Sequence, residues 1–185
     1  MPEDVTLFRR DYHLWSTNSI VTGATEVEFF NLISGSKMAD DSTTVRPGHT
    51  NLLEANKLPK GYDMRVEGMA ILYEEDSDIV DIRALRKYAQ LELKTQKQEW
   101  GTFYPRLIGG GVPTVLEGQT NFENVRTGGG QISALYPFAE PLILKDQEIF
   151  KVLWKYDSNL KPTLNATQFV TIVFVGQLTQ PGASN

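Results

Sequence analysis

The chain of 185 residues contains no cysteine, which excludes disulfides, thiolate zinc sites and a cysteine nucleophile. Histidine is almost as scarce, with His13 and His49 as its only two representatives. A catalytic zinc site based on histidine takes two or three histidines together with a carboxylate. Because each of the two stands alone in a polar stretch, we expect both at the surface and no bound metal.

The chain also lacks an excess of positive charge and a long apolar run. Lys and Arg number 18 against 23 Asp and Glu, a net charge of −5, whereas nucleic-acid binders carry a basic footprint. The longest apolar run, "FVTIVFVG" at residues 169–176, is less than half of the ~20 residues that a membrane-spanning helix needs. The N-terminus shows no basic stretch followed by an apolar one, so we expect no signal peptide and synthesis in a cytoplasm.

Aromatic residues are plentiful: nine Phe, seven Tyr and three Trp. Such residues fit a pleated, half-buried surface and favour strands. The remaining composition, 41% hydrophobic and 22% charged, is that of an ordinary globular chain long enough to bury a core as one domain.

Alternation predicts strands. Residues 89–95, "AQLELKT", and 149–156, "IFKVLWKY", alternate apolar and polar positions, the period of a strand with one wet face. Residues 168–178, "QFVTIVFVGQL", are apolar on both faces and predict a central strand. Further candidates are residues 25–33, 62–74, 98–108 and 141–145. The pattern predicts a core that includes Leu91, Leu93, Phe150, Val152, Trp154, Ile172 and Phe174.

One helix is expected over residues 77–87, "SDIVDIRALRK". Ser77 and Asp78 suit the N-cap, and the order of acidic before basic residues suits the helix dipole. The acidic run at residues 74–81 lacks the glycine and terminal glutamate of an EF-hand loop, so we interpret it as a solvated helix N-terminus, with a loosely bound calcium as the alternative.

Two triple glycines, at residues 109–111 and 128–130, raise the question of a phosphate-binding loop. Such a loop is followed by a helix whose N-terminus supplies amides and positive potential. Here prolines follow instead, and no Lys-Ser or Lys-Thr pair completes a motif. We therefore interpret both runs as corners between β-layers, where glycine gives the chain room to turn.

Two long segments, residues 34–60 and 109–130, lack periodicity. Loops of this length in a compact domain tend to be functional or to cover something. With about eight strands and one short helix, the layout predicts an all-β sandwich or barrel rather than βαβ units. No G-x-S-x-G elbow is present, and no nucleophile, base and oxyanion donor can be named together.

The stretch "EWGTFYP" at residues 99–105 places Trp100, Phe103 and Tyr104 beside the second long segment. Core packing is the first interpretation of such a group. The alternative is a subunit contact, because aromatic side chains are enriched at the buried centres of interfaces.

The order of "LPKGYDMRVEGMAILYEE", a short helix, "YAQLELKTQKQEWGTFYPRLIGGGV", "PLILKDQEIFKVLWKY" and "QFVTIVFVGQL" resembles the single jelly-roll virion proteins of membrane-containing icosahedral phages and archaeal viruses. The resemblance is one of layout over residues 24–178. It implies a single eight-stranded antiparallel jelly-roll barrel at residues 24–178, preceded by an N-terminal arm at 1–23 and followed by a C-terminal tail at 179–185.

In that family small β-barrels tile the virion shell, often as two related capsid proteins. The resemblance therefore implies a structural capsid subunit without catalytic residues, cofactor, small-molecule substrate or direct nucleic-acid contact. Its partners would be copies of itself and a second capsid protein, in the virion and near an internal membrane. The alternatives are a carbohydrate-binding jelly roll, either lectin-like or a receptor-binding spike domain, for which exposed Trp100 and Tyr104 would argue, and a glycosidase, which needs two carboxylates about 5–10 Å apart.

Overall fold

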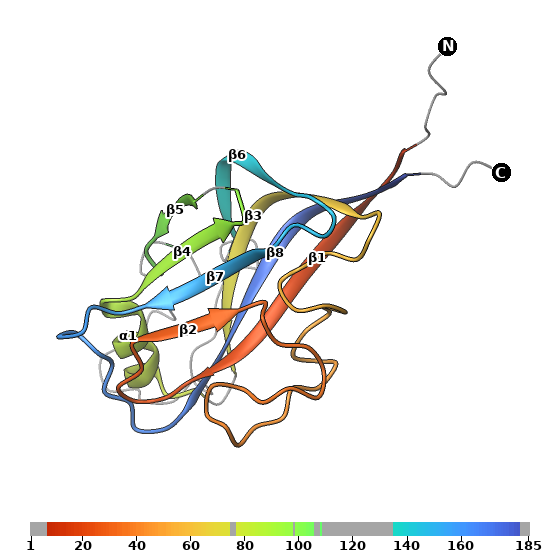
Figure 1. Ribbon diagram of the computed structural model, residues 1–185. Coiled ribbons are helices and arrows are strands. Elements are labelled where there is room, and N and C mark those ends of the chain that lie inside the picture. Colours follow the sequence, from red (N-terminus) through yellow and green to blue (C-terminus); the bar gives the residue numbers. More distant parts are fainter. Residues whose placement is uncertain (1–6, 75–76, 98, 106–107, 109–134, 182–185) are drawn as a thin grey trace, which may run out of the picture.

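A computed structural model of the chain describes residues 7–74, 77–97, 99–105, 108 and 135–181. These residues form eight strands in two four-stranded antiparallel sheets, with a single helix at one end (Figure 1). The predicted all-β class is thereby confirmed.

The first sheet has the strand order β1-β8-β3-β6 and contains the longest strands. β1 pairs with β8 along its whole length, from Leu7 opposite Pro181 to Ile20 opposite Gln168. The four strands are β1 (Leu7–Ile20), β8 (Gln168–Pro181), β3 (Asp63–Tyr73) and β6 (Leu135–Leu144).

The second sheet has the order β2-β7-β4-β5 and is built from shorter strands. Its central strands are the two whose alternation is most regular in the sequence. The four strands are β2 (Glu26–Phe29), β7 (Phe150–Lys155), β4 (Gln90–Thr95) and β5 (Glu99–Phe103).

The pairing of the strands is nested. β1 pairs with β8, β2 with β7, β3 with β6 and β4 with β5, as in one long antiparallel ribbon folded back at its middle. Two further pairings, β3 with β8 and β4 with β7, convert the ribbon into two sheets. Most of the stabilising contacts therefore join residues far apart in sequence.

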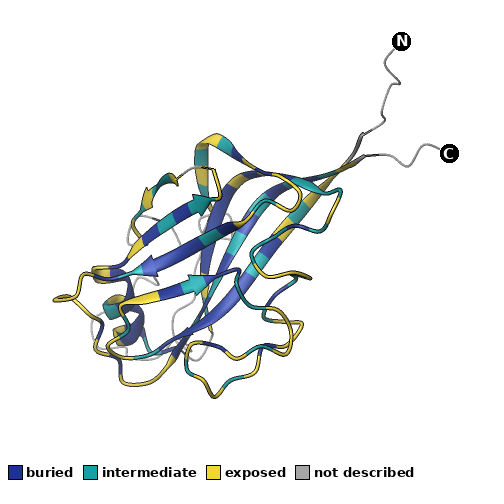
Figure 2. Ribbon diagram, in the orientation of Figure 1, coloured by how far each residue is buried: buried dark blue, intermediate teal, exposed yellow. Residues whose placement is uncertain are grey.

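The core lies between the sheets and is continuous (Figure 2). Aromatic rings fill its centre: Phe30 stacks on Phe174 with a centroid distance of 4.7 Å, and Phe29 lies 6.3 Å from Trp154. All of the residues predicted for the core are buried, which confirms the alternation on which that prediction rests: Leu91, Leu93, Phe150, Val152, Trp154, Ile172 and Phe174.

The helix α1 (Ile79–Lys87) lies at one end of the sandwich, within the range predicted for it (Figure 1). Asp78 is its N-cap, and the side-chain Oδ1 accepts a hydrogen bond of 2.8 Å from the backbone N–H of Val80. The Leu7 end of β1 and the Pro181 end of β8 lie at the opposite end (Figure 1).

β1 occupies most of the segment expected as an N-terminal arm, and β8 continues past the expected boundary at residue 179. The sheet therefore extends into both terminal segments. The sequence pattern predicts no strand at residues 7–20, because the inward side of β1 changes from apolar to polar, with Ser16 and Asn18 buried beyond Leu14. No alternation of apolar and polar residues marks such a strand.

Candidate functional site

The described residues contain no group of three or more His, Cys, Asp or Glu side chains that could hold a metal ion. His13 is exposed on β1, as expected. His49 is half-buried, and its Nδ1 accepts a hydrogen bond of 3.1 Å from the backbone N–H of Arg46. No helix in the described part of the chain is long and apolar enough to span a membrane.

The aromatic group considered as a subunit contact is divided by the structure. Trp100 and Phe103 are partly buried against the core, whereas Tyr104 is 40% exposed. Phe103 also contacts two rings of β6, with centroid distances of 5.8 Å to Tyr136 and 5.5 Å to Phe138.

This cluster of Phe103, Tyr136 and Phe138 joins the edge strands of the two sheets, since β5 ends the second sheet and β6 ends the first. It closes one side of the sandwich with aromatic packing rather than with backbone hydrogen bonds. The contribution of Trp100, Phe103 and Tyr104 to a subunit contact remains a prediction. The two triple glycines, at 109–111 and 128–130, lie outside the described residues.

The opposite side of the sandwich is closed by polar side chains of β1. The amide of Asn18 donates to the carbonyl oxygen of Glu28 at 2.9 Å, and the Ser16 hydroxyl accepts from the backbone N–H of Phe30 at 2.9 Å. Each side chain belongs to β1, at the edge of the first sheet, and bonds to the backbone at or just after β2, at the edge of the second sheet. The polar residues that hid β1 from the sequence analysis are therefore the ones that hold the two sheets together there.

Residues 34–60 cover the free edge of β1. The backbone N–H of Thr17 donates to the carbonyl of His49 at 2.7 Å, and that of Trp15 donates to Asn51 Oδ1 at 3.0 Å. Further along, the N–H of Asp40 donates to Ser19 Oγ at 2.9 Å. An exposed edge strand is a template for pairing with other chains, and this cover removes the template along residues 13–19 of β1.

The covering segment is itself packed into the domain. Among its buried residues are Met38, Val45, Thr50, Leu52 and Leu58. Its length, which the sequence analysis connects with function, is explained in part by this structural task.

Helix α1 is attached to the domain through two buried charged residues. The carboxylate of Asp81 accepts hydrogen bonds from the backbone N–H groups of Asn165 and Ala166 and from Gln168 Nε2, at 2.9–3.2 Å. Arg86 donates to the carbonyl oxygens of Pro105 and Ile108 at 3.0–3.2 Å. The expectation of a solvated acidic helix start is thus wrong for Asp81, which is 1% exposed.

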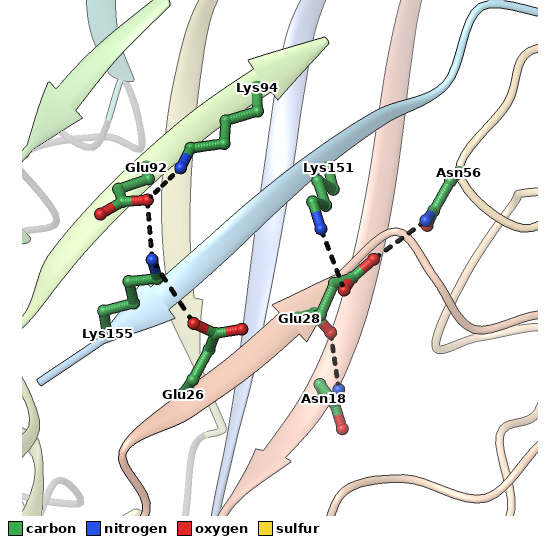
Figure 3. Close-up of polar contacts among 8 residues, drawn as sticks. All are labelled: Asn18, Glu26, Glu28, Asn56, Glu92, Lys94, Lys151 and Lys155. Carbon is green, nitrogen blue, oxygen red and sulfur yellow. Dashed lines mark hydrogen bonds and ion pairs between the residues drawn. The ribbon is translucent and has the colours of Figure 1, made fainter. Parts of the chain in front are cut away.

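The outer face of the second sheet carries a ladder of ion pairs across its strands (Figure 3). Glu92 Oε2 lies 2.7 Å from Lys94 Nζ and 2.9 Å from Lys155 Nζ, and Lys155 is also 3.5 Å from Glu26. Hydrogen bonds from Lys94 and Lys155 lower the pKa of Glu92, and the same bonds raise the pKa of both lysines. A second pair joins Lys151 and Glu28 at 3.8 Å.

The outer face of the first sheet is different in its central part. Trp15, Val173, Ala70 and Leu135 follow one another across all four strands as register partners. Leu135 in this row is 37% exposed, and Leu72 beside the row is 47% exposed. Charged side chains return towards the chain termini, where a hollow of about 490 Å³ is lined in part by Arg9, Arg65, Lys145, Asp63 and Glu67.

A smaller pocket of about 180 Å³ lies between β1 and the covering segment. Its apolar wall includes Leu14, Leu52 and Leu58, all buried. Its polar and aromatic side chains are those of Arg10, Tyr12, Asn51 and Tyr62.

Comparisons with models of protein families, with curated proteins and with solved structures find nothing that matches this chain.

Proposed function

We propose that the two sheets form a jelly roll and that the chain is a capsid subunit that assembles into an icosahedral shell. The observation that carries this proposal is the strand order, β1-β8-β3-β6 against β2-β7-β4-β5. A ribbon of nested antiparallel pairs that is rolled into two facing sheets produces this order. It is the architecture that the sequence resemblance implies.

The treatment of the sheet edges supports an assembling subunit. β1 is covered by residues 34–60, β2 and β5 have only four and five residues, and β6 carries Pro137 and Pro141. Proline and short length both oppose the addition of a further strand. A protein that exists in many copies at high local concentration needs such protection, and its contacts then have to use faces and loops.

The proposed partners are copies of the chain itself and a second capsid protein, within a virion and close to an internal membrane. Neither direct contact with nucleic acid nor an enzymatic activity is part of the proposal. The net charge of −5 favours association by shape and local pairing over binding to a phosphate backbone. Symmetric assembly repeats one contact many times, so that each contact can be weak.

Electron microscopy tests the proposal. The purified protein, alone and coexpressed with products of neighbouring genes, is examined for shells by negative staining, and particles released from cells that carry the gene are labelled with an antibody to the chain. We expect regular shells or labelled virions. A protein that remains monomeric at millimolar concentration and is absent from every particle fraction would contradict the capsid function.

A carbohydrate-binding module is the second candidate, and the pocket beside β1 favours it. Tyr12, Tyr62, Asn51 and Arg10 offer the rings and polar groups that sugars bind. The volume of about 180 Å³ is below the ~300 Å³ at which small-molecule pockets usually begin, which places this candidate second. Binding on a glycan array that is lost in Tyr12→Ala and Tyr62→Ala variants would favour it, with Tyr88→Ala, at a 43% exposed position at the end of helix α1, as the control.

A further inference from the structure

The outer face of the first sheet carries an uncharged apolar patch, which we define as Trp15, Leu72, Leu135, Val173 and Val175. The members lie on all four strands of the sheet at outward positions, since the alternating residues Val170, Ile172 and Phe174 of β8 are buried in the core. Ala70 lies between Val173 and Leu135 and fills the row that joins them.

The patch contrasts with the outer face of the second sheet. There, the charged side chains are already satisfied by partners within the chain, as the contacts of Glu92, Lys155 and Glu28 show (Figure 3). The apolar side chains of the patch form no ion pairs, and their exposure to water is unfavourable. Burial of the patch would release free energy in proportion to the area that leaves the solvent.

The size of the patch indicates what kind of contact it can make. Strands lie about 4.8 Å apart and successive outward residues about 6.8 Å apart, so three rows on four strands cover roughly 300–400 Å². Patches of this size on a single chain are often functional, yet a stable complex buries about 800 Å² on each partner. The patch alone therefore supports a weak contact, of the kind that becomes strong when a lattice repeats it.

We propose that this patch binds the same patch of a second copy of the chain, across a two-fold axis that runs perpendicular to the strands near Ala70 and Val173. The inference rests on the proposed function in expecting a second copy as the partner. In a two-fold contact each residue meets its counterpart in reverse order. The row of Thr17, Thr171 and Leu72 then faces the row of His13, Val175 and Gly68, and no carboxylate or lysine is buried.

The positions of the charged residues favour this perpendicular axis over an axis parallel to the strands. A two-fold axis parallel to the strands would place the edge strand β1 opposite β6. It would also set the charged end of the sheet, with Arg9 and the Lys145–Asp63 ion pair, against the same end of the second copy and remove these charges from water. The perpendicular axis leaves that end, with Arg65 and Glu67, outside the contact and in water. Two copies that each carry a net charge of −5 can then approach through their uncharged faces.

The absence of cysteine makes a direct test possible, because one introduced cysteine is the only thiol in the protein. Packed sheets lie about 10 Å apart, too far for a disulfide, so a short bismaleimide is the appropriate crosslinker. We expect Val173→Cys protein to give crosslinked dimers at high concentration. Thr102→Cys, at an exposed position on the charged outer face of the second sheet, is the control and should give few.

A charge substitution gives an independent measurement by sedimentation velocity. Leu72→Asp buries a carboxylate in the contact and should weaken self-association by about tenfold or more. Leu160→Asp is the matched control, since Leu160 is 43% exposed in the loop before β8, and it should leave association within about twofold of the wild type. Circular dichroism verifies that both variants are folded.

The other outcomes overturn either the inference or the proposed function. Equal crosslinking at positions 173 and 102, or unchanged association of Leu72→Asp, would remove the patch as a contact between copies. Binding to phosphatidylcholine–phosphatidylglycerol vesicles that Leu72→Asp abolishes, without an effect on self-association, would assign the patch to a lipid surface. Shells that form normally from Leu72→Asp protein would refute the patch but preserve the capsid function, whereas specific dimers of a protein that never enters particles would preserve the patch and refute the capsid function.

Discussion

At the scale of single residues, the aromatic centre of the core connects the two sheets. Trp154 lies in β7 with no exposed surface and contacts Phe29 of the neighbouring strand β2. We expect Trp154→Ala to lower the free energy of unfolding by about 3–5 kcal/mol, because removal of the large ring leaves a cavity that the sheets cannot fill. Denaturant titration measures this change. Leu160→Ala, at an exposed position, is the control, and a loss below about 1 kcal/mol for Trp154→Ala would contradict the packing.

Glu92 is the residue at which charge and stability are coupled most directly. Its two lysine partners lower its pKa below the ordinary value of 4.5, so the carboxylate stabilises the fold above pH 4.5 and loses this effect as the pH falls through the lower folded value. We expect Glu92→Gln to cost about 0.5–1 kcal/mol at pH 7 and less at pH 3.

Thermal unfolding at the two pH values measures this difference. Glu67→Gln is the control, because Glu67 and its partner Arg65 are both about half exposed, at 52% and 53%, and an ion pair in that setting contributes little. A cost of Glu92→Gln that is equal at both pH values would show that the carboxylate acts through packing rather than through its charge.

At the scale of elements, helix α1 is held by the buried Asp81 as well as by its buried apolar residues Ile79, Ile82 and Leu85. The side chain of Asp81 accepts from donors on three residues of the segment that leads into β8. We expect Asp81→Ala to cost about 2–3 kcal/mol, because buried donors are left without an acceptor. Arg83→Ala on the exposed side of the same helix is the control.

Hydrogen exchange distinguishes a local loss of the attachment through Asp81 from a general loss of stability. In the Asp81→Ala variant, the amides of α1 and of residues 165–168 should exchange faster before those of β7 and β4 do. Uniform acceleration across the whole domain would show that Asp81 has no local role.

The elements also show what a sequence reveals and what it conceals. β4 and β7 have one apolar and one polar face, and β8 is apolar on both, so their patterns predict them and the core residues they carry. β1 was concealed because its inward positions serve two purposes, packing at Leu14 and hydrogen bonding at Ser16 and Asn18. The attachment of helix α1 through Asp81 could not be predicted from the sequence either, because the donors to Asp81 lie more than 80 residues away in the chain.

At the scale of the whole molecule, the two outer faces differ in chemistry. The charged side chains on the outer face of the second sheet pair with one another, whereas the central outer face of the first sheet is uncharged. The pattern of β8, apolar on both faces, predicts only one member of this uncharged row. The row of Trp15, Ala70, Leu135 and Val173 is assembled from four strands that are distant in the chain, so no local pattern predicts it as a whole. The contact that the sequence predicts at the aromatic residues near β5 stays a prediction, and the folded molecule offers this row as a separate candidate surface.

The covering segment, residues 34–60, occupies the edge of β1 to which another chain could otherwise add a strand. Met38, Val45 and Thr50 within residues 38–50 are buried. The same stretch supplies the carbonyl of His49, which accepts from the Thr17 N–H, and the N–H of Asp40, which donates to the Ser19 hydroxyl. Deletion of residues 38–50 would expose apolar side chains and unpaired backbone groups of β1 together. We expect the deletion variant to aggregate, with increased binding of thioflavin T, rather than to persist as a monomer that fails to assemble.

A matched variant distinguishes the cover from a contact surface. Arg46→Ala changes an exposed side chain of the same segment without removing its buried residues, so the variant should stay folded and monomeric in dilute solution. Static light scattering and thermal unfolding compare the two proteins. If the deletion variant instead unfolds cooperatively at the wild-type temperature and stays soluble, the segment is not needed to protect β1, and its length would then have to be explained by binding to a neighbouring chain.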